Sequence, residues 1–140
     1  MGDSAEIKKR FNEQDVRNFS ELSEDRNPIH LDVTYAGQSR FGRRIVHGML
    51  SSSLFSAILG TKLPGKGSIY LSQNLSFKAP IYLDEEVTAR VEVTAVHETK
   101  PIVTFTTQCF NEQGALCIDG QAVVLVPHHA GRLKRKPNVP

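Results

Sequence analysis

The most constraining feature of this chain is an uncharged stretch, residues 45–61, which contains no Asp, Glu, Lys or Arg. Its apolar residues fall on every side of a helical wheel: Met49, Leu50, Leu54, Phe55, Ala57, Ile58 and Leu59. A helix that is apolar all round is expected to be buried all round, and Gly60 suits the left-handed position that ends a helix. The stretch is too short for a membrane span and contains four serines. The rest of the chain must therefore wrap one central helix.

The segments that follow this helix predict antiparallel strands, because apolar and β-branched residues alternate in them. The expected strands cover residues 68–78, 87–97, 101–110 and 115–126, with a hairpin loop at 111–114. The alternation places Ile69, Leu71, Leu75 and Phe77 on one face of the first strand, and Val87, Ala89, Val91, Val93 and Ala95 on one face of the second. Residues 5–11 add a short edge strand. One helix inside several long antiparallel strands is an α+β arrangement.

Short helices are expected before the central one. Asn12 is placed to cap a helix that runs to about Ser23, since acidic residues follow in its first turn. Pro28 forbids continuation of that helix. Residues 25–30 are therefore expected to form a polar loop, and the next short helix to start near Asp32.

Length and charge fit one soluble domain, residues 1–127, followed by a basic tail, 128–140, that is expected to be disordered. The net charge is only +2, and part of the positive excess lies in the tail, which argues against a nucleic-acid surface on the fold. Cys109 and Cys117 lie in strand-like segments without metal-ligand spacing. They are expected to be reduced core residues of a cytoplasmic protein that has no signal peptide.

Two motifs carry a family resemblance. Residues 25–32 read DRNPIHLD and residues 41–50 read FGRRIVHGML; together they resemble the MaoC-like hydratases, and most of all the short, single-domain enzymes that feed polyhydroxyalkanoate synthesis. The similarity continues through residues 63–70 and 75–80, then with less specific residues to about Val126. The resemblance implies the hotdog fold, a curved antiparallel sheet wrapped around a central buried helix. It also implies a homodimer in which two sheets join and two central helices lie side by side.

The activity that the resemblance implies is that of an R-specific 2-enoyl-CoA hydratase, a hydro-lyase of fatty acid metabolism. It would reversibly hydrate short-chain trans-2-enoyl-CoA to (R)-3-hydroxyacyl-CoA, with an acyl-CoA thioester as its partner and no metal, organic cofactor, nucleic acid or membrane. Three alternatives stay open: a hotdog acyl-CoA thioesterase, an acyl-carrier-protein dehydratase, and a non-catalytic acyl-CoA or protein-binding module. The paired acid and imidazole described next favour hydration over hydrolysis.

Asp25 and His30 are the candidate acid–base pair. They lie five residues apart in one segment bent by Pro28, so a carboxylate and an imidazole can converge on one water. Hydration of an enoyl thioester needs a base for water and a proton for Cα, and the resemblance assigns both tasks to this pair. The alternative is that both side chains only form hydrogen bonds within a turn.

Gly48 is the third candidate catalytic residue, because it opens the central helix. N–H groups of a first helical turn lack intrahelical partners, and with the helix dipole behind them they suit a developing enolate oxygen. Glycine also lets a thioester approach closely. The alternative is an ordinary glycine at a helix start. His47 is expected to make a structural hydrogen bond instead of acting in catalysis.

Four further residues are candidates for substrate binding: Asn27, Ser56, Leu59 and Val124. Ser56 lies on the helical face that begins at Gly48, and the resemblance implies that its hydroxyl orients Asp25; the alternative is a bond to a carbonyl of its own helix. Leu59 is the first bulky residue further along this face, so it is a candidate floor for the acyl pocket together with Val124. Plain core packing is the alternative for Leu59.

Overall fold

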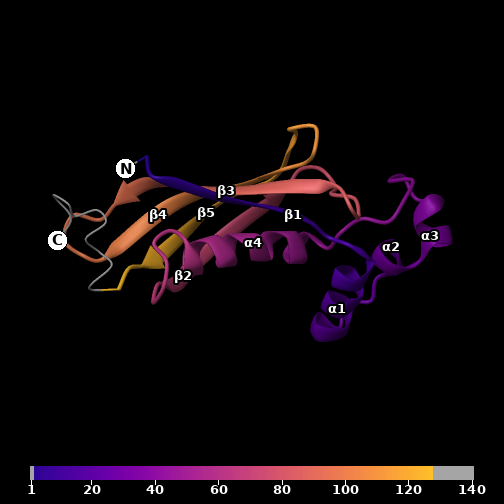
Figure 1. Ribbon diagram of the computed structural model, residues 1–140, viewed down its shortest axis with the longest axis horizontal. Helices are drawn as coiled ribbons and strands as arrows, with labels where there is room; N and C mark the ends of the chain where they lie inside the picture. The colour runs from indigo at the N-terminus through magenta and orange to yellow at the C-terminus, as the bar shows by residue number, and fades with distance from the viewer. Residues whose placement is uncertain (1, 128–140) are drawn as a thin grey trace.

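The computed structural model describes residues 2–127, so the expected tail from residue 128 lies outside the described part of the chain. Nine elements follow one another, as Figure 1 shows: β1 (Ser4–Arg10), α1 (Glu13–Ser23), α2 (Pro28–Leu31), α3 (Val33–Gly37), α4 (Gly48–Thr61), β2 (Ile69–Phe77), β3 (Glu86–Val96), β4 (Ile102–Phe110) and β5 (Leu116–Leu125). The expected strands, the central helix and the hairpin loop at 111–114 are confirmed within a few residues at their ends.

The five strands form one sheet in the order β1-β3-β4-β5-β2, and every neighbouring pair is antiparallel. The sheet lies along α4, while α1, α2 and α3 gather beyond the N-terminal end of that helix (Figure 1). This arrangement confirms the predicted α+β class. It also places the N-terminal end of α4, where Gly48 lies, next to the three short helices.

The core fills the space between α4 and the inner face of the sheet. Leu54, Phe55, Ile58 and Leu59 of α4 are buried in one cluster with the inward residues of the strands, among them Val87, Ala89, Val91, Val93, Phe105, Ala122 and Val124. Burying one such large apolar side chain contributes about 1.5–3 kcal/mol relative to leaving it exposed. The core therefore fixes α4 against the sheet over most of its length.

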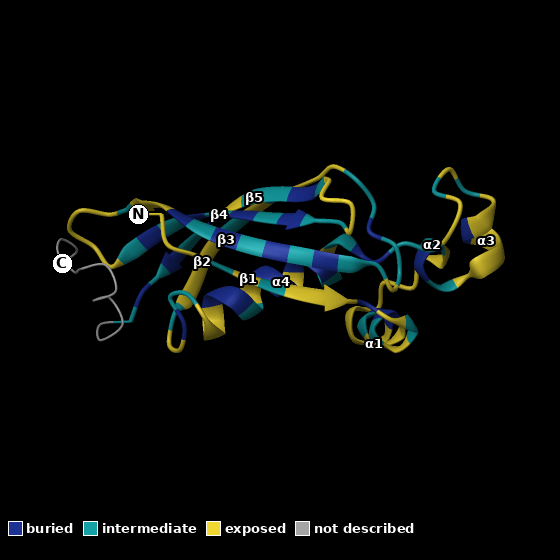
Figure 2. Cartoon of the chain, turned by 45° about the horizontal axis from the view of Figure 1, so that its top comes forward, coloured by how far each residue is buried: buried dark blue, intermediate teal, exposed yellow. Residues whose placement is uncertain are grey.

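The prediction that the central helix is buried all round was wrong for the single chain. The sheet covers one side of α4, and on the other side Met49 is 60% exposed and Ser53, Ser56 and Gly60 are exposed as well (Figure 2). The prediction for Gly60 was also wrong. The helix continues through this residue to Thr61, and Lys62 after it has right-handed backbone angles.

In two strands, a register shift interrupts the alternation that was predicted to decide which residues face the core. In β3, Val87, Ala89, Val91 and Val93 are buried as predicted, but a shift between Val93 and Ala95 leaves Ala95 exposed. In β2, a shift between Tyr70 and Ser72 interrupts the alternation. Most of this edge strand is exposed, including the side chains of Ile69, Leu71 and Phe77.

The N-terminal helices begin at capped positions. Asn12 caps α1 as predicted and forms a reciprocal capping box with Asp15, and Asp32 caps α3. The expected loop at 25–30 was wrong in its second half, because Pro28 occupies the first turn of α2 and Asn27 accepts a hydrogen bond from the backbone N–H of Ile29. A proline in a first helical turn starts a helix, since no N–H is needed there.

Burial bears out the expectation for the cysteines: Cys109 and Cys117 are both fully buried and unpaired. Burial also raises the pKa of the Cys109 thiol to about 12, so it stays protonated. Among the described residues, α4 and the other helices are all too short or too polar to cross a membrane.

Candidate active site

Asp25, His30 and His47 come together where α2 meets the segment that leads into α4. One side-chain oxygen or nitrogen of each lies within 4.8 Å of the other two. The turn before α2 supplies Asp25, α2 itself supplies His30, and His47 immediately precedes α4. The structure therefore brings the two predicted catalytic side chains together, with a second histidine beside them.

The imidazole of His30 is buried and held in one tautomer. Its Nδ1–H donates to the backbone carbonyl of Ile45 at 2.7 Å. Since a carbonyl only accepts, Nδ1 carries a proton, and in the neutral imidazole the lone pair is on Nε2. His30 is thereby prepared to accept a proton at Nε2.

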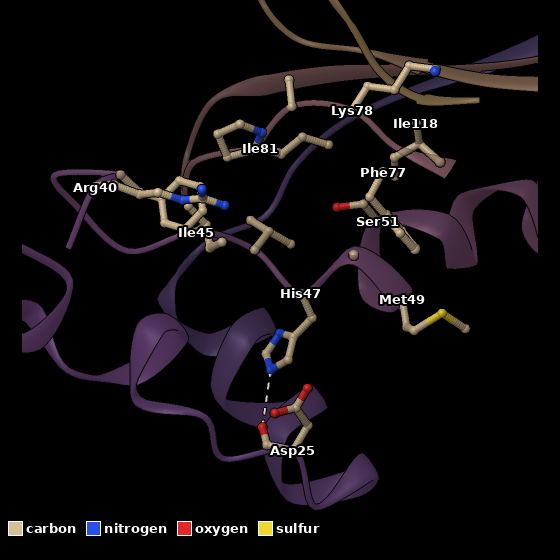
Figure 3. Close-up of a pocket in the computed structure, with 15 residues that line it drawn as sticks. Asp25, Arg40, Ile45, His47, Met49, Ser51, Phe77, Lys78, Ile81 and Ile118 are labelled. Carbon is tan, nitrogen blue, oxygen red and sulfur yellow. Dashed lines mark hydrogen bonds between the residues drawn. The ribbon is translucent and has the colours of Figure 1, made fainter. Parts of the chain in front are cut away.

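His47 makes the structural hydrogen bonds that were expected of it. Its Nε2–H donates to the backbone carbonyl of Asp25 at 3.3 Å (Figure 3) and lies 2.9 Å from the hydroxyl of Ser20. The ring also stacks on His30, with centroids 3.8 Å apart. Burial lowers the pKa of His47, and charge repulsion from His30 lowers it further, although the hydrogen bond to Asp25 opposes both. A neutral His47 thus supports His30 without competing for its proton.

Asp25 is exposed and sits in a short turn. Its carboxylate accepts a hydrogen bond from the N–H of Asn27 at 3.2 Å, and its own N–H donates to Ser23. These bonds confirm the turn geometry that was the alternative explanation for Asp25. They leave the second carboxylate oxygen available beside the imidazole, so the turn also serves to aim the acid.

A cavity of about 430 Å³ opens beside this cluster (Figure 3). Asp25, His47 and Gly48 form part of its wall, and the rest is mainly apolar, with Phe41, Ile45, Val46, Phe77, Ala79, Pro80, Ile81 and Ile118. The cavity offers an apolar space that ends at a carboxylate and a helix N-terminus. Such a space fits a thioester with an attached apolar chain.

Gly48 is the first residue of α4, as predicted, and the side chain of His47 does not cap the helix. The N–H groups of this first turn therefore remain for other acceptors. The position is also crowded, because a Cβ on Gly48 would lie 2.6 Å from Cε1 of Phe77. Glycine is the residue that leaves the cavity open at this point.

The four predicted substrate-binding residues lie outside the wall of this cavity, and their roles stay predictions. Ser56 faces a different hollow, against β2, with Tyr70 and Gln73 among its neighbours. Leu59 and Val124 are buried in the core cluster. Asn27 caps α2. The structure brings none of these four into the wall of the cavity beside Asp25.

Sequence reasoning missed three polar side chains of this cavity, Arg40, Ser51 and Lys78. Ser51 lies one turn after His47, and its buried hydroxyl makes no hydrogen bond within the described residues. Its place among three consecutive serines gave no signal in the sequence, since only packing decides which of them faces the cavity.

The side chains of Asp25, His30 and His47 raise the question of whether a metal ion could bind between them. They offer three ligands of two types, a carboxylate and two imidazoles, that transition metals accept. However, the two imidazole planes are stacked at an angle of 24°, so their in-plane lone pairs run side by side instead of converging on one ion. Nδ1 of His30 is moreover engaged with Ile45. The arrangement favours an acid–base pair over a metal centre.

Comparison with known proteins agrees with this geometry. Residues 3–112 match the family model described as the MaoC like domain. The chain is 56% identical over 127 residues to the (R)-specific enoyl-CoA hydratase of Aeromonas caviae, covering 91% of this chain and 95% of that protein. It is 47% identical over 126 residues to the enzyme of the same name from Rhodospirillum rubrum, covering 90% and 87%.

A third relative is the mitochondrial 3-hydroxyacyl-[acyl-carrier-protein] dehydratase of Arabidopsis thaliana, 38% identical over 131 residues and covering 91% of this chain and 78% of that protein. Among solved structures, the (R)-hydratase from A. caviae involved in PHA biosynthesis superposes with a TM-score of 0.89, covering 90% of this chain and 96% of that one. This match confirms the hotdog fold. The chain belongs to the MaoC-like family of hotdog-fold hydratases.

Proposed function

We propose that this protein is an R-specific 2-enoyl-CoA hydratase, which adds water reversibly to a short-chain trans-2-enoyl-CoA to give the (R)-3-hydroxyacyl-CoA. The observation that carries the proposal is the meeting of Asp25 and His30 in one cluster, in which Asp25 also forms part of the wall of a mainly apolar cavity. The high identity to two enzymes of this name supports it. The proposal includes the supply of monomers for polyhydroxyalkanoate synthesis, the role printed for the A. caviae structure, and a cytoplasmic location, where unpaired thiols such as Cys109 stay reduced.

The proposed reaction uses one water between Asp25 and His30. Together the pair removes a proton from the water as its oxygen attacks Cβ of the enoyl thioester, and the same proton is then delivered to Cα. The Nδ1–H bond to Ile45 directs Nε2 of His30 to accept the proton from water and to release it again. A positioned acid–base group of this kind contributes typically about 10²–10⁴-fold to the rate.

The thioester oxygen gains negative charge as water adds, and the start of α4 is proposed to stabilise it. The N–H of Gly48 and the partial positive charge of the helix N-terminus face no capping side chain from His47. An N–H that is already in place stabilises the enolate without reorganisation during the reaction.

The test is hydration of crotonyl-CoA, followed by loss of absorbance of the conjugated thioester, with chiral analysis of the product. We expect the R product from wild type. Asp25→Asn and His30→Ala should each lose about 10²–10⁴-fold in kcat, and the double variant should lose little more, because both act on one water. His97→Ala is the matched control, since this histidine lies in the β3–β4 turn. Near-normal turnover in folded Asp25→Asn, or an S product, would contradict the proposal.

The carrier of the acyl group needs its own measurement, because one relative acts on acyl carrier protein according to its name. Crotonyl groups on CoA and on acyl carrier protein should be compared at equal concentration, and we expect the higher kcat/KM on CoA. A free-thiol assay run in parallel detects thioester cleavage. Release of thiol in place of hydration would identify a thioesterase.

Assembly as a homodimer is part of the proposal. The outer side of α4 and the edge strand β2 together expose large apolar side chains: Met49, Ile69, Tyr70, Leu71 and Phe77. A second copy would cover these residues and the unpaired edge of β2. Analytical ultracentrifugation should find a dimer. A stable and fully active monomer would refute this part.

A further inference from the structure

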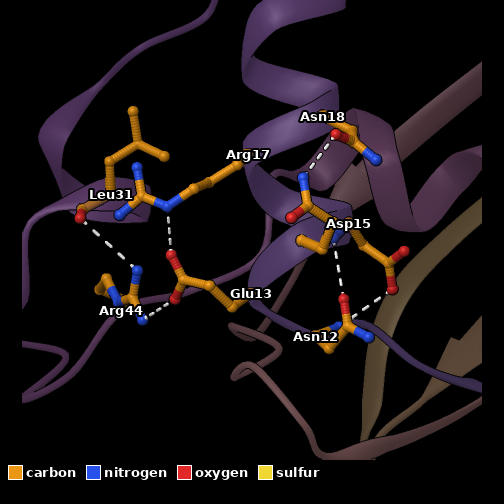
Figure 4. A network of polar contacts seen from close by, with 8 residues as sticks. Asn12, Glu13, Asp15, Arg17, Asn18, Leu31 and Arg44 are labelled. Carbon is orange, nitrogen blue, oxygen red and sulfur yellow. Dashed lines mark hydrogen bonds and ion pairs between the residues drawn. The ribbon is translucent and has the colours of Figure 1, made fainter.

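Arg44 ties together the two chain segments that hold the imidazole of His30. One of its guanidinium nitrogens pairs with the carboxylate of Glu13 in α1, and another donates to the backbone carbonyl of Leu31 in α2 at 3.5 Å (Figure 4). The Arg44 side chain is only 16% exposed. One buried fork thus joins α1, α2 and the segment before α4.

This fork acts on both partners of the hydrogen bond that orients His30. The acceptor is the carbonyl of Ile45, the residue directly after Arg44. The donor belongs to α2, and Arg44 binds the carbonyl of Leu31, the residue directly after His30. Displacement of the Arg44 side chain would therefore loosen the donor segment and the acceptor segment at once, leaving the backbone bond from Ile45 to Ile29 as their remaining direct link.

A backbone hydrogen bond joins the same two segments, since the N–H of Ile45 donates to the carbonyl of Ile29 at 3.3 Å, and a bridge joins Ile45 to Tyr82. The Arg44 guanidinium holds the pKa of the Glu13 carboxyl below its usual range, so the charge pair stays formed at neutral pH. Arginine suits this task because its planar fork donates in two directions.

We propose that Arg44 is a positioning residue for hydration, which fixes the tautomer and the place of His30 by clamping α2 to the segment before α4. The proposal rests on the catalytic role of His30 proposed above. It assigns Arg44 no contact with substrate. Its effect is expected in kcat, because Arg44 is not among the residues that line the cavity, where the substrate is proposed to bind.

The test compares Arg44→Met, which keeps the packed stem, with wild type and with Arg17→Met. Arg17 pairs with the same Glu13 carboxylate (Figure 4), but among the described residues no hydrogen bond or ion pair ties its side chain to α2 or to Ile45. We expect Arg44→Met to lower kcat by about 10–100-fold, the scale of a misplaced catalytic group, with KM nearly unchanged. Arg17→Met should change neither, and Arg44→Lys should recover only part of the loss, since an ammonium lacks the fork.

A second readout separates this proposal from the catalytic assignment. Nitrogen–proton NMR spectra of the histidine rings, with His30 identified by loss of its signals in His30→Ala, report which nitrogen carries the proton. We expect the Nδ1–H form in wild type and in Arg17→Met, and a mixture of tautomers in Arg44→Met. Full activity of His30→Ala would overturn the catalytic role, and the tautomer result would still test the clamp.

An unchanged tautomer or an unchanged kcat in folded Arg44→Met would overturn the proposal. Thermal unfolding must first show that the variant is folded at the assay temperature. If it is not, Glu13→Gln takes its place, because it keeps the size of the side chain and removes the charge that holds Arg44. The same shift in tautomer and loss in kcat are then expected.

Discussion

Addition of a single methyl group at Gly48 should separate catalysis from stability. In Gly48→Ala the new Cβ would lie 2.6 Å from Cε1 and 2.8 Å from Cδ1 of Phe77, whereas ordinary contacts begin at 3.4 Å. The difference, 3.4 − 2.6 = 0.8 Å, is the least that the two groups must move apart. Phe77 is 54% exposed within one protomer, so its ring can move at small cost to the fold of that protomer.

The same movement should be costly for the reaction. The methyl group and the displaced Phe77 ring both enter the cavity beside Asp25 and His47, where the thioester is proposed to lie. A displacement of roughly 1 Å at a reacting centre can cost about 10²-fold. We therefore expect kcat/KM on crotonyl-CoA to fall about 100-fold in Gly48→Ala. The free energy of unfolding should stay within about 1 kcal/mol of wild type or rise, because alanine favours a helix.

Gly60→Ala is the control, since it lies in the same helix and its Cβ would meet nothing within 4 Å. It should leave kcat/KM unchanged and stabilise the protein by up to about 1 kcal/mol. Hydration kinetics and urea denaturation of wild type, Gly48→Ala and Gly60→Ala test this prediction. Wild-type kcat/KM in folded Gly48→Ala would refute the close approach of substrate to the start of α4.

Three further predictions concern the core, the sheet and cofactors. Leu59→Ala should cost about 2–5 kcal/mol of stability, as expected for a buried leucine; if Leu59 is also the acyl-pocket floor, kcat/KM for C8 relative to C4 enoyl-CoA should rise, and an unchanged ratio would leave it a core residue. Gly120→Ala would place a Cβ 2.0 Å from the backbone oxygen of Asn74, so urea denaturation should show a loss of about 1–3 kcal/mol or more, and wild-type stability would contradict the β2–β5 register. Dialysis against a chelator should leave hydration unchanged, and activity restored only by added metal would contradict the acid–base mechanism.

Local chemistry was sufficient to predict the elements that depend on a few adjacent residues. Asn12 caps α1 and Asp32 caps α3 because a short polar side chain satisfies the free N–H groups of a helix start. The hairpin at 111–114 follows from Gly114, which adopts a positive φ of 83°. These interactions span only a few residues, so sequence alone predicts them.

Prediction failed where a neighbour distant in sequence decides the outcome. Composition alone predicted an α4 buried on all sides, but the sheet of one chain covers one side only, and Met49 stays exposed. Gly60 suits a helix end, yet packing of Ile58 and Leu59 in the core carries the helix past it. The edge strand β2 shifts register after Tyr70, a change that pairing with β5 imposes.

In the candidate site too, some features follow from adjacent residues and others from contacts between distant parts of the chain. The sequence by itself determined that Asp25 and His30 lie close together around a proline and that a glycine starts α4, because these are local patterns; the roles predicted for them came from the family resemblance. Tertiary structure decided that His47 stacks on His30 and that Ile45, fifteen residues away in the chain, accepts its Nδ1–H. Orientation of an imidazole depends on the acceptor that packing brings to it, and that acceptor is a backbone atom, which no sequence pattern marks.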